Sequence, residues 1–293
     1  MTLTFADAVR LVDGATSFAE LTNTIPGDTY RILVKLIHPD TVDPPRKAPA
    51  TTAFLKLSQL HDGQFRAAYQ GDIADLLTDR DGRLVKVPRS PGDNDLMEAE
   101  ADALRRLQDN GDPKFRPYAP RLLDSYLHED ADRKRRRVNV LERLDGFIPL
   151  SSLHRTIDWR DAAWMWRRLL VGLGWAHQAG VIHGAVLEEH VLIHPAEHGL
   201  AIVDWCYSGS RPKAIVKHRA EAYPPEVSSK TATPATDIFM ATGLMTRLIG
   251  PGIPEQLRRF ADGCSYAAPR MRPQDAWQLL AEFDEIIPPQ YRN

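Results

Sequence analysis

Cysteine is scarce in this chain of 293 residues, and Cys206 and Cys264 are the only two. Their wide separation fits neither a disulfide framework nor a cysteine metal motif, which favours a reducing compartment such as the cytoplasm. Long apolar runs are also missing, because the most apolar stretch, WMWRRLLVGLGWA, is interrupted by Arg167 and Arg168. We therefore expect no membrane span, and the opening residues do not resemble a signal peptide.

An excess of charge of one sign is absent as well. The chain has 37 basic and 39 acidic residues, so its formal net charge of −2 gives no general attraction to nucleic acid or to an anionic membrane. The densest basic run is Arg133–Arg137, which contains no interleaved aromatic residue. We interpret it as a solvated loop, with polyanion binding as the alternative.

The chain changes character twice along its length. Residues 1–62 carry apolar residues at helical spacing, residues 63–150 have the pattern of strands with one amphipathic helix, and residues 151–293 are mostly helical. In the middle region we expect two strands joined by the turn Asp79–Gly82, then a helix in NDLMEAEADALRRLQD and a hairpin with its tip in DADRKR. This order predicts an α+β fold, in which a small N-terminal helical domain precedes a domain of two lobes.

Several segments of the last two regions follow one another in a recognisable order. The strand RLVKVPR contains Lys86, the helix DLMEAEADALRRL contains Glu98 and Glu100, and VIHGAVLEEHVLI is followed by LAIVDWC with Asp204. Farther along come AYPPEV, ATDIFMATGLMTRLIG and PRMRPQDAWQLL. Over roughly residues 64–288, these segments resemble the protein-kinase-like fold.

The resemblance implies a role for each matching residue. Lys86 would hold the phosphates of ATP, and Glu100 would pair with Lys86. Glu98 is the second choice for that pairing, because two leucines follow Glu100 on the core side of the helix. Asp204 would hold Mg²⁺ weakly, and Gly71 would lie in the loop over the phosphates. The family's structural frame would comprise His183, Asp237 and the pair Glu226 and Arg272.

The departures from the family fall on its chemistry. Ala185 stands where the family has the carboxylate that accepts a proton, a role that contributes about 10²–10⁴-fold in rate. His190 stands where an Asn normally binds the second metal ion, and imidazole is a poor ligand for Mg²⁺. The phosphate loop has only Gly71 and adds Asp72 and Asp75, which repel phosphate. The resemblance therefore implies a pseudokinase without a catalytic residue.

Each of these positions also has a plainer interpretation. Lys86 could be a surface lysine, Asp204 could cap the following turn, and His190 could be a hydrogen-bonded loop histidine and not a ligand. Glu188 and Glu189 could supply a substitute base, although a solvated loop face is the simpler interpretation.

The stretch RILVKLIHPDTV places His38, Pro39 and Asp40 after a predicted helix that carries Tyr30 and Lys35. A proline-rich loop, TVDPPRKAPATT, leads to a further predicted helix, TAFLKLSQLHD, with one apolar face. Over residues 28–62 this arrangement resembles the J domain of DnaJ-like Hsp70 co-chaperones, which implies that these five residues contact Hsp70. Residues 1–27 lack the family's first-helix pattern. Alternatively, Pro39 starts a helix that Asp40 caps.

We therefore expect a J-domain-containing pseudokinase that acts as a binding and regulatory adaptor, responsive to weakly bound ATP with Mg²⁺ and linked to Hsp70. One alternative is an atypical ATP-dependent kinase with a non-standard base. The other is a purely structural interaction module.

Overall fold

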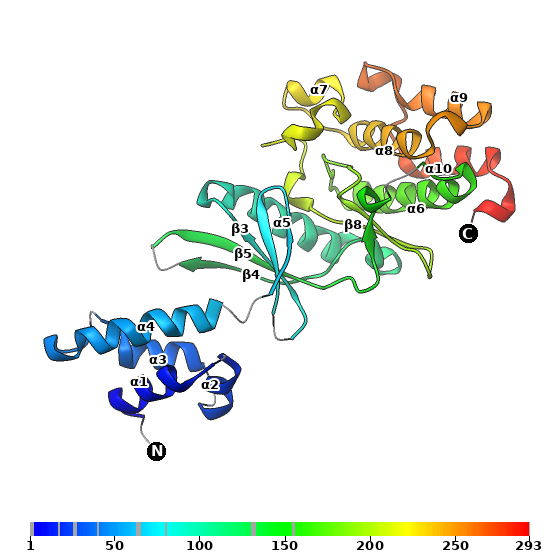
Figure 1. Cartoon of the computed structure of the whole chain (residues 1–293). Helices are drawn as coiled ribbons and strands as arrows, with labels where there is room; N and C mark the ends of the chain where they lie inside the picture. The colour runs from blue at the N-terminus through cyan, green and yellow to red at the C-terminus, as the bar shows by residue number, and fades with distance from the viewer. Residues whose placement is uncertain are drawn as a thin grey trace. The chain divides into compact units, whose positions relative to one another are not determined.

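The computed structural model describes residues 3–16, 18–25, 28–39, 41–62, 66–79, 81–129, 133–153 and 156–292 (Figure 1). The chain divides into two compact units, residues 1–70 with 75–85, and residues 71–74 with 86–293. Helices are combined with two small sheets, whose strand orders are β1-β2-β3-β5-β4 and β6-β7-β8. The fold class is therefore mixed α and β, compatible with the predicted α+β class.

The described part of the first unit contains the helices α1 (Phe5–Gly14), α2 (Phe18–Thr24), α3 (Thr29–Ile37) and α4 (Lys47–Asp62). Thr4 and Asp7 form a capping box at the start of α1. Leu33 and Ile37 of α3 and Leu57 of α4 are fully buried in the shared core, and Phe54 and Leu60 pack against it. Phe54, Leu57 and Leu60 therefore face the core, as their spacing predicted.

Two boundaries in this unit differ from the prediction. The proline-rich segment 41–52 is not a loop throughout, because η1 (Pro44–Arg46) and the first turns of α4 lie within it. Pro49 is tolerated there since the first turn of a helix needs no intrahelical amide donor. Helix α2 was not predicted.

The predicted pair of strands before residue 89 is in fact three strands. They are β1 (Arg66–Gln70), β2 (Ala74–Thr78) and β3 (Leu84–Pro88). β1 pairs with β2 in antiparallel register, Arg66 opposite Thr78 and Gln70 opposite Asp75. The expected turn after β2 is present, with Gly82 at a φ of 76° and its N–H donating to Asp79 O at 3.1 Å.

The second unit contains α5 (Asn94–Asn110) and the hairpin of β4 (Leu122–Glu129) and β5 (Arg135–Leu141). The antiparallel register of β4 and β5 confirms the predicted hairpin. The basic run was wrongly placed as a whole in a loop, since its last three residues belong to β5. There Arg135 pairs with Glu129 at 3.1 Å and Arg137 with Glu98 at 3.5 Å.

The remaining elements of the second unit are mostly helical. The small sheet consists of β6 (Ile148–Pro149), β7 (Val191–His194) and β8 (Gly199–Ile202). The helices are α6 (Trp159–Gln178), α7 (Pro225–Ser228), α8 (Pro234–Ile249), α9 (Glu255–Cys264) and α10 (Ala276–Ile286). Short 3-10 turns connect them: η2 (Pro91–Asp93), η3 (Pro113–Tyr118), η4 (Leu150–Ser152), η5 (Trp205–Tyr207), η6 (Lys217–Ala222), η7 (Gly250–Gly252), η8 (Pro269–Met271) and η9 (Pro289–Tyr291).

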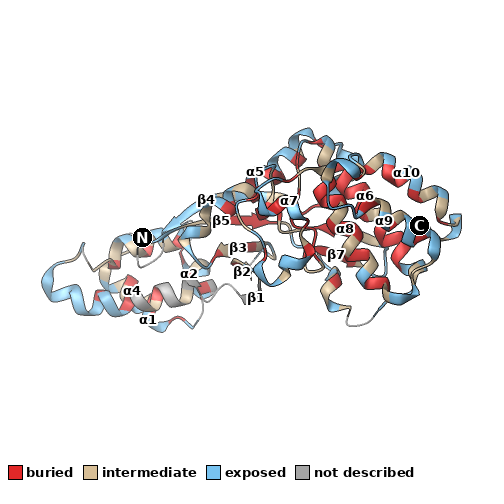
Figure 2. Cartoon of the chain, turned by 90° about the horizontal axis from the view of Figure 1, so that it is seen from above, coloured by how far each residue is buried: buried red, intermediate tan, exposed pale blue. Residues whose placement is uncertain are grey.

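Helix α6 forms the centre of this helical part. It packs against α8 and α10, and most of α6 and α8 is buried (Figure 2). Arg167 of α6 reaches Asp284 of α10 at 2.8 Å, so its charge is paired where the helix meets its neighbour. No helix within the described ranges is long and apolar enough to cross a membrane.

Candidate functional site

Three charged side chains meet inside the second unit. Lys86 of β3 is 2% exposed, and Glu100 of α5 is 1% exposed. The Nζ of Lys86 lies 2.8 Å from Glu100 Oε1 and also contacts Asp204 Oδ1. Glu98, the second choice for this contact, points instead to Arg137. Lys86 is therefore a buried, doubly paired cation and not a surface lysine.

The position of Glu100 is fixed from two sides. It lies on the buried side of α5 among the apolar residues that anchor that helix. Asn139 of β5 is fully buried and donates its Nδ2–H to Glu100 Oε2 at 2.9 Å, and Ser125 of β4 donates to Asn139 Oδ1 at 2.8 Å. Both carboxylate oxygens thus have partners, as a buried charge requires. Sequence reasoning missed Asn139, although one polar residue within the strand VNVL was a usable signal.

Asp204 follows β8 in the left-handed backbone region, at φ 61° and ψ 48°. Among the described residues its side chain makes no capping bond to the following turn, so the capping interpretation was wrong. Its Oδ2 lies 3.6 Å from His190 Nε2. Burial opposes ionisation, but the Lys86 ammonium holds the pKa of Asp204 at about 2, so this carboxylate is charged at neutral pH.

A buried carboxylate organises the loop before β7. Asp237 of α8 accepts the backbone N–H groups of His183 and Gly184, each at 2.8 Å. The His183 ring donates from Nε2 to Val203 O at 2.8 Å and accepts the Ala185 N–H at Nδ1. Burial lowers the pKa of His183 to about 4, so the ring is neutral and holds the loop in shape.

Ala185 is fully buried and offers only a methyl group to the cluster. Its carbonyl oxygen lies 2.8 Å from His190 Nδ1, and because a carbonyl only accepts, this nitrogen carries the proton. Burial alone would lower the pKa of His190, but Asp204 and a hydrogen bond to Asp72 raise it. His190 is therefore a hydrogen-bonded loop histidine that bridges to two carboxylates.

Asp72 lies in the turn before β2, where the resemblance places the phosphate-covering loop. Its Oδ2 is 3.2 Å from His190 Nε2, and this bond lowers the pKa of Asp72. The Gly71 N–H already donates to Ala74 O at 2.9 Å. Arg89 donates to Gly71 O at 2.8 Å and also to Asp72 O, which fastens the turn.

Neither of the two glutamates of the loop is an unpaired base. Glu188 forms an ion pair with Arg219, and Glu189 Oε1 accepts from the Arg219 Nε at 3.0 Å. Their side chains are 27% and 22% exposed. A second ion pair lies farther from the cluster, where Arg272 reaches Glu226 at 2.6 and 3.1 Å.

Four of the five N-terminal candidates lie on α3 or directly after it: Tyr30 is near the start of the helix, Lys35 is near its end, and His38 and Pro39 follow it. Tyr30 packs against the core of the first unit, and Lys35 is exposed. His38 and Pro39 are half-buried, and the His38 ring lies edge-on to Phe54 with 5.1 Å between the centroids. Asp40 lies outside the described residues.

The alternative role of Pro39 as the start of a helix was wrong. The next helical residue after α3 in the described ranges is Pro44, at the start of η1. His38 instead caps the carboxyl end of α3, its N–H donating to Val34 O at 2.9 Å.

No protein-family model matches the chain, and neither does any curated protein.

The ion cluster generates a prediction for Lys86→Met. The substitution leaves Glu100 and Asp204 buried without their cation, so we expect a loss of about 3–5 kcal/mol in unfolding free energy at pH 7. In the natural chain Asp204 titrates near 2 when folded against 3.8 unfolded, so its stabilisation is complete above about pH 4 and is lost below. In the variant, Asp204 stays buried without its cation, so the pKa of its carboxyl rises and the deficit shrinks as the pH falls from 7 to 4.5.

Urea unfolding at several pH values measures this difference. The control is Lys114→Met, an exposed position where we expect a change of at most about 0.5 kcal/mol. A deficit that stays constant between pH 7 and 4.5 contradicts the assignment of a charge cluster.

Proposed function

We propose that this chain joins a J-like helical domain to a kinase-like domain that has lost efficient phosphoryl transfer, and that it acts as a binding and regulatory adaptor. One observation carries the proposal. The Lys86–Glu100–Asp204 cluster is assembled, while the neighbouring Ala185 contributes no acid or base. These charged residues would hold phosphate and metal beside a position that cannot accept a proton.

The wider frame of the second unit supports the kinase-like assignment. A lysine on a strand pairs with a glutamate on the following helix, and an aspartate follows a later short strand. Asp237 holds the intervening loop, and Glu226 pairs with Arg272. All these residues are ones that the resemblance selects, and the contacts of Asp237 with the loop and of Glu226 with Arg272 join residues 54 and 46 positions apart.

The surroundings of Ala185 support the loss of catalysis. Transfer needs a group that orients or deprotonates the acceptor hydroxyl, together with metal ions that bridge the phosphates. Glu188 and Glu189 are engaged by Arg219, and His190 is engaged by Ala185 O and Asp72. Each of these three side chains thus already has an ionic or hydrogen-bonded partner.

ATP with Mg²⁺ is the proposed ligand of the second unit, with weak affinity. Lys86 would contact phosphate, and Asp204 Oδ2 supplies one hard oxygen for the metal. Asp72 adds a negative charge on the same side, which repels phosphate. The balance of these charges favours binding in the millimolar range.

A thermal melt tests nucleotide binding. At a tenfold excess of ATP over its dissociation constant we expect about 1.4 kcal/mol of stabilisation, and a melting temperature higher by about 3–5 °C. Mg²⁺ should increase the shift because it screens Asp72 and Asp204. ATP should not raise the melting temperature of Lys86→Ala above that of the same variant without ATP. It should raise the melting temperature of Lys114→Ala as it does for the natural chain. An equal shift in Lys86→Ala contradicts the proposed site.

Hsp70 is the proposed partner of the first unit. His38 and Pro39 are partly exposed at the end of α3, and Lys35 on that helix adds an exposed cation. A cation there would favour docking on an acidic surface. The first unit also has its own core, which allows it to present these residues on a fixed frame.

Stimulated ATP hydrolysis by Hsp70 tests this partner. The chain should accelerate single-turnover hydrolysis, and His38→Gln should return the rate to that of Hsp70 alone. His128→Gln, at an exposed position on β4, is the matched control and should behave like the natural chain. No acceleration by the natural chain, or equal acceleration by His38→Gln, would remove Hsp70 from the proposal.

A further inference from the structure

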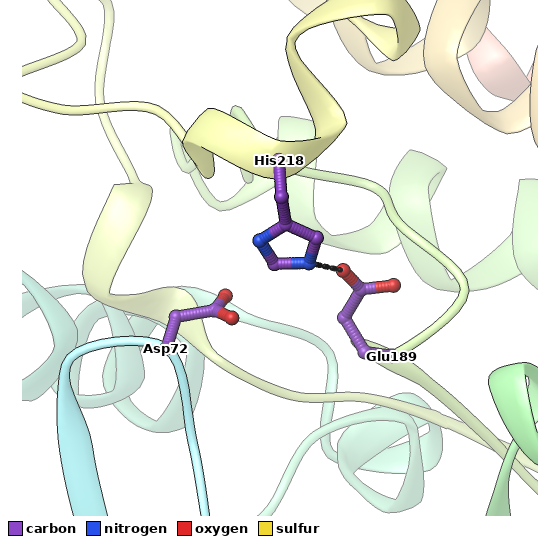
Figure 3. Close-up of side chains that lie close together, drawn as sticks. All are labelled: Asp72, Glu189 and His218. Carbon is purple, nitrogen blue, oxygen red and sulfur yellow. Dashed lines mark ion pairs between the residues drawn. The ribbon is translucent and has the colours of Figure 1, made fainter.

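Three potential metal ligands from separate segments converge beside the ion cluster. They are Asp72 in the turn before β2, Glu189 just before β7, and His218 in η6. Each offers one ligand atom, and these atoms lie within 4.8 Å of one another. Figure 3 shows the Asp72 carboxylate and the His218 ring facing the same space, with the His218 Nε2 3.5 Å from Glu189 Oε1.

The spacing suits a small divalent ion. Metal–ligand bonds of about 2.0–2.2 Å place tetrahedral ligand atoms about 3.4 Å apart. The His218–Glu189 distance already matches this value, and Asp72 has at most about 1.4 Å to close. Asp72 lies in a short turn, so a small movement of this turn and its side chain brings the carboxylate oxygen to the distance that a shared metal ion requires.

The charge around this space favours a cation. Asp72, Glu188, Glu189 and Asp204 are acidic, whereas two basic side chains contact this group, Arg219 at Glu188 and Glu189 and Lys86 at Asp204, so the acidic side chains are in excess. In addition, Glu189 Oε2 is buried and has no hydrogen-bond partner within the part of the chain that the structure describes. The terminal torsion of a glutamate is soft, so a rotated carboxylate can give this unsatisfied oxygen a ligand.

The contacts that would compete with a metal ion are replaceable. Arg219 shares its guanidinium between Glu188 and Glu189, so it keeps one carboxylate when Glu189 turns to a metal. Asp72 contacts His190 through Oδ2, which leaves Oδ1 for a second partner.

We propose that Asp72, Glu189 and His218 bind one divalent transition-metal ion of the Zn²⁺ class. One imidazole nitrogen and two carboxylate oxygens suit Zn²⁺, Co²⁺ or Mn²⁺ better than Mg²⁺ or Ca²⁺, which prefer oxygen ligands alone. Three protein ligands leave a fourth position for water or an anion. The ion joins the turn at 71–74, the loop before β7 and η6. This site excludes Lys86 and Asp204, and it does not rest on the proposed function.

Metal titration of the full chain after removal of metal by a chelator tests the site. We expect one Zn²⁺ per chain in competition with a chromophoric chelator, and a Co²⁺ absorption band that reports a nitrogen and oxygen ligand set. His218→Ala and Glu189→Gln should each raise the dissociation constant at least about tenfold. His218 is 64% exposed, so its removal should leave the fold intact, and unchanged circular dichroism and melting temperature without metal check this.

The matched control is His128→Ala, which removes an exposed histidine elsewhere and should bind Zn²⁺ like the natural chain. The proposal is overturned if neither Zn²⁺ nor Co²⁺ binds at millimolar concentration, or if both ligand variants bind like the control. Neither result bears on the ATP and Hsp70 experiments, because no nucleotide or partner is present in this titration.

Discussion

The buried ion cluster of Lys86, Glu100 and Asp204 is the interaction on which the second unit depends. A lysine that is 2% exposed is stable as a cation only if its partners are fixed, and here α5 and the end of β8 supply them. Burial opposes charge on Lys86, yet the Asp204 carboxylate keeps the pKa of the Lys86 ammonium well above its usual value. Asn139 completes the arrangement by holding the second oxygen of Glu100. The cluster thereby links β3, α5 and the turn after β8 to one another.

A second constraint shapes the loop around Ala185. Asp237 accepts two backbone amides of this loop, and neutral His183 spans from Val203 O to the Ala185 amide. Gly184 is required there, since a Cβ at this position would lie 2.7 Å from a backbone oxygen. The loop is thus as firmly supported as a working site requires. The side chain that this loop places beside the cluster is the methyl group of Ala185. The adaptor proposal is based on this contrast between a fully hydrogen-bonded loop and the lack of a proton-accepting side chain at residue 185.

Much of this architecture could be predicted because it depends on local patterns. The helical spacing of α5 selected Glu100 over Glu98, and two strand-like segments on either side of the polar tip DADRKR located the hairpin of β4 and β5. Features that depend on tertiary contacts were missed. The short turn at 71–73 divides into two strands a segment that was predicted as one, and the approach of Asp72 to His190 joins residues 118 positions apart. The same holds for the convergence of Glu189 and His218, because no spacing rule links a loop residue to a distant turn.

The most direct test of the central claim is a phosphoryl-transfer measurement on the full chain. The chain is incubated with γ-labelled ATP, Mg²⁺ and a general protein acceptor, and label on both proteins is followed over time beside Asp204→Ala. We expect the natural chain to transfer no more label than this variant, since Ala185 cannot accept the hydroxyl proton and the nearby carboxylates are engaged. Time-dependent transfer that Asp204→Ala abolishes would contradict the account and would establish an atypical ATP-dependent kinase with a base supplied from another position.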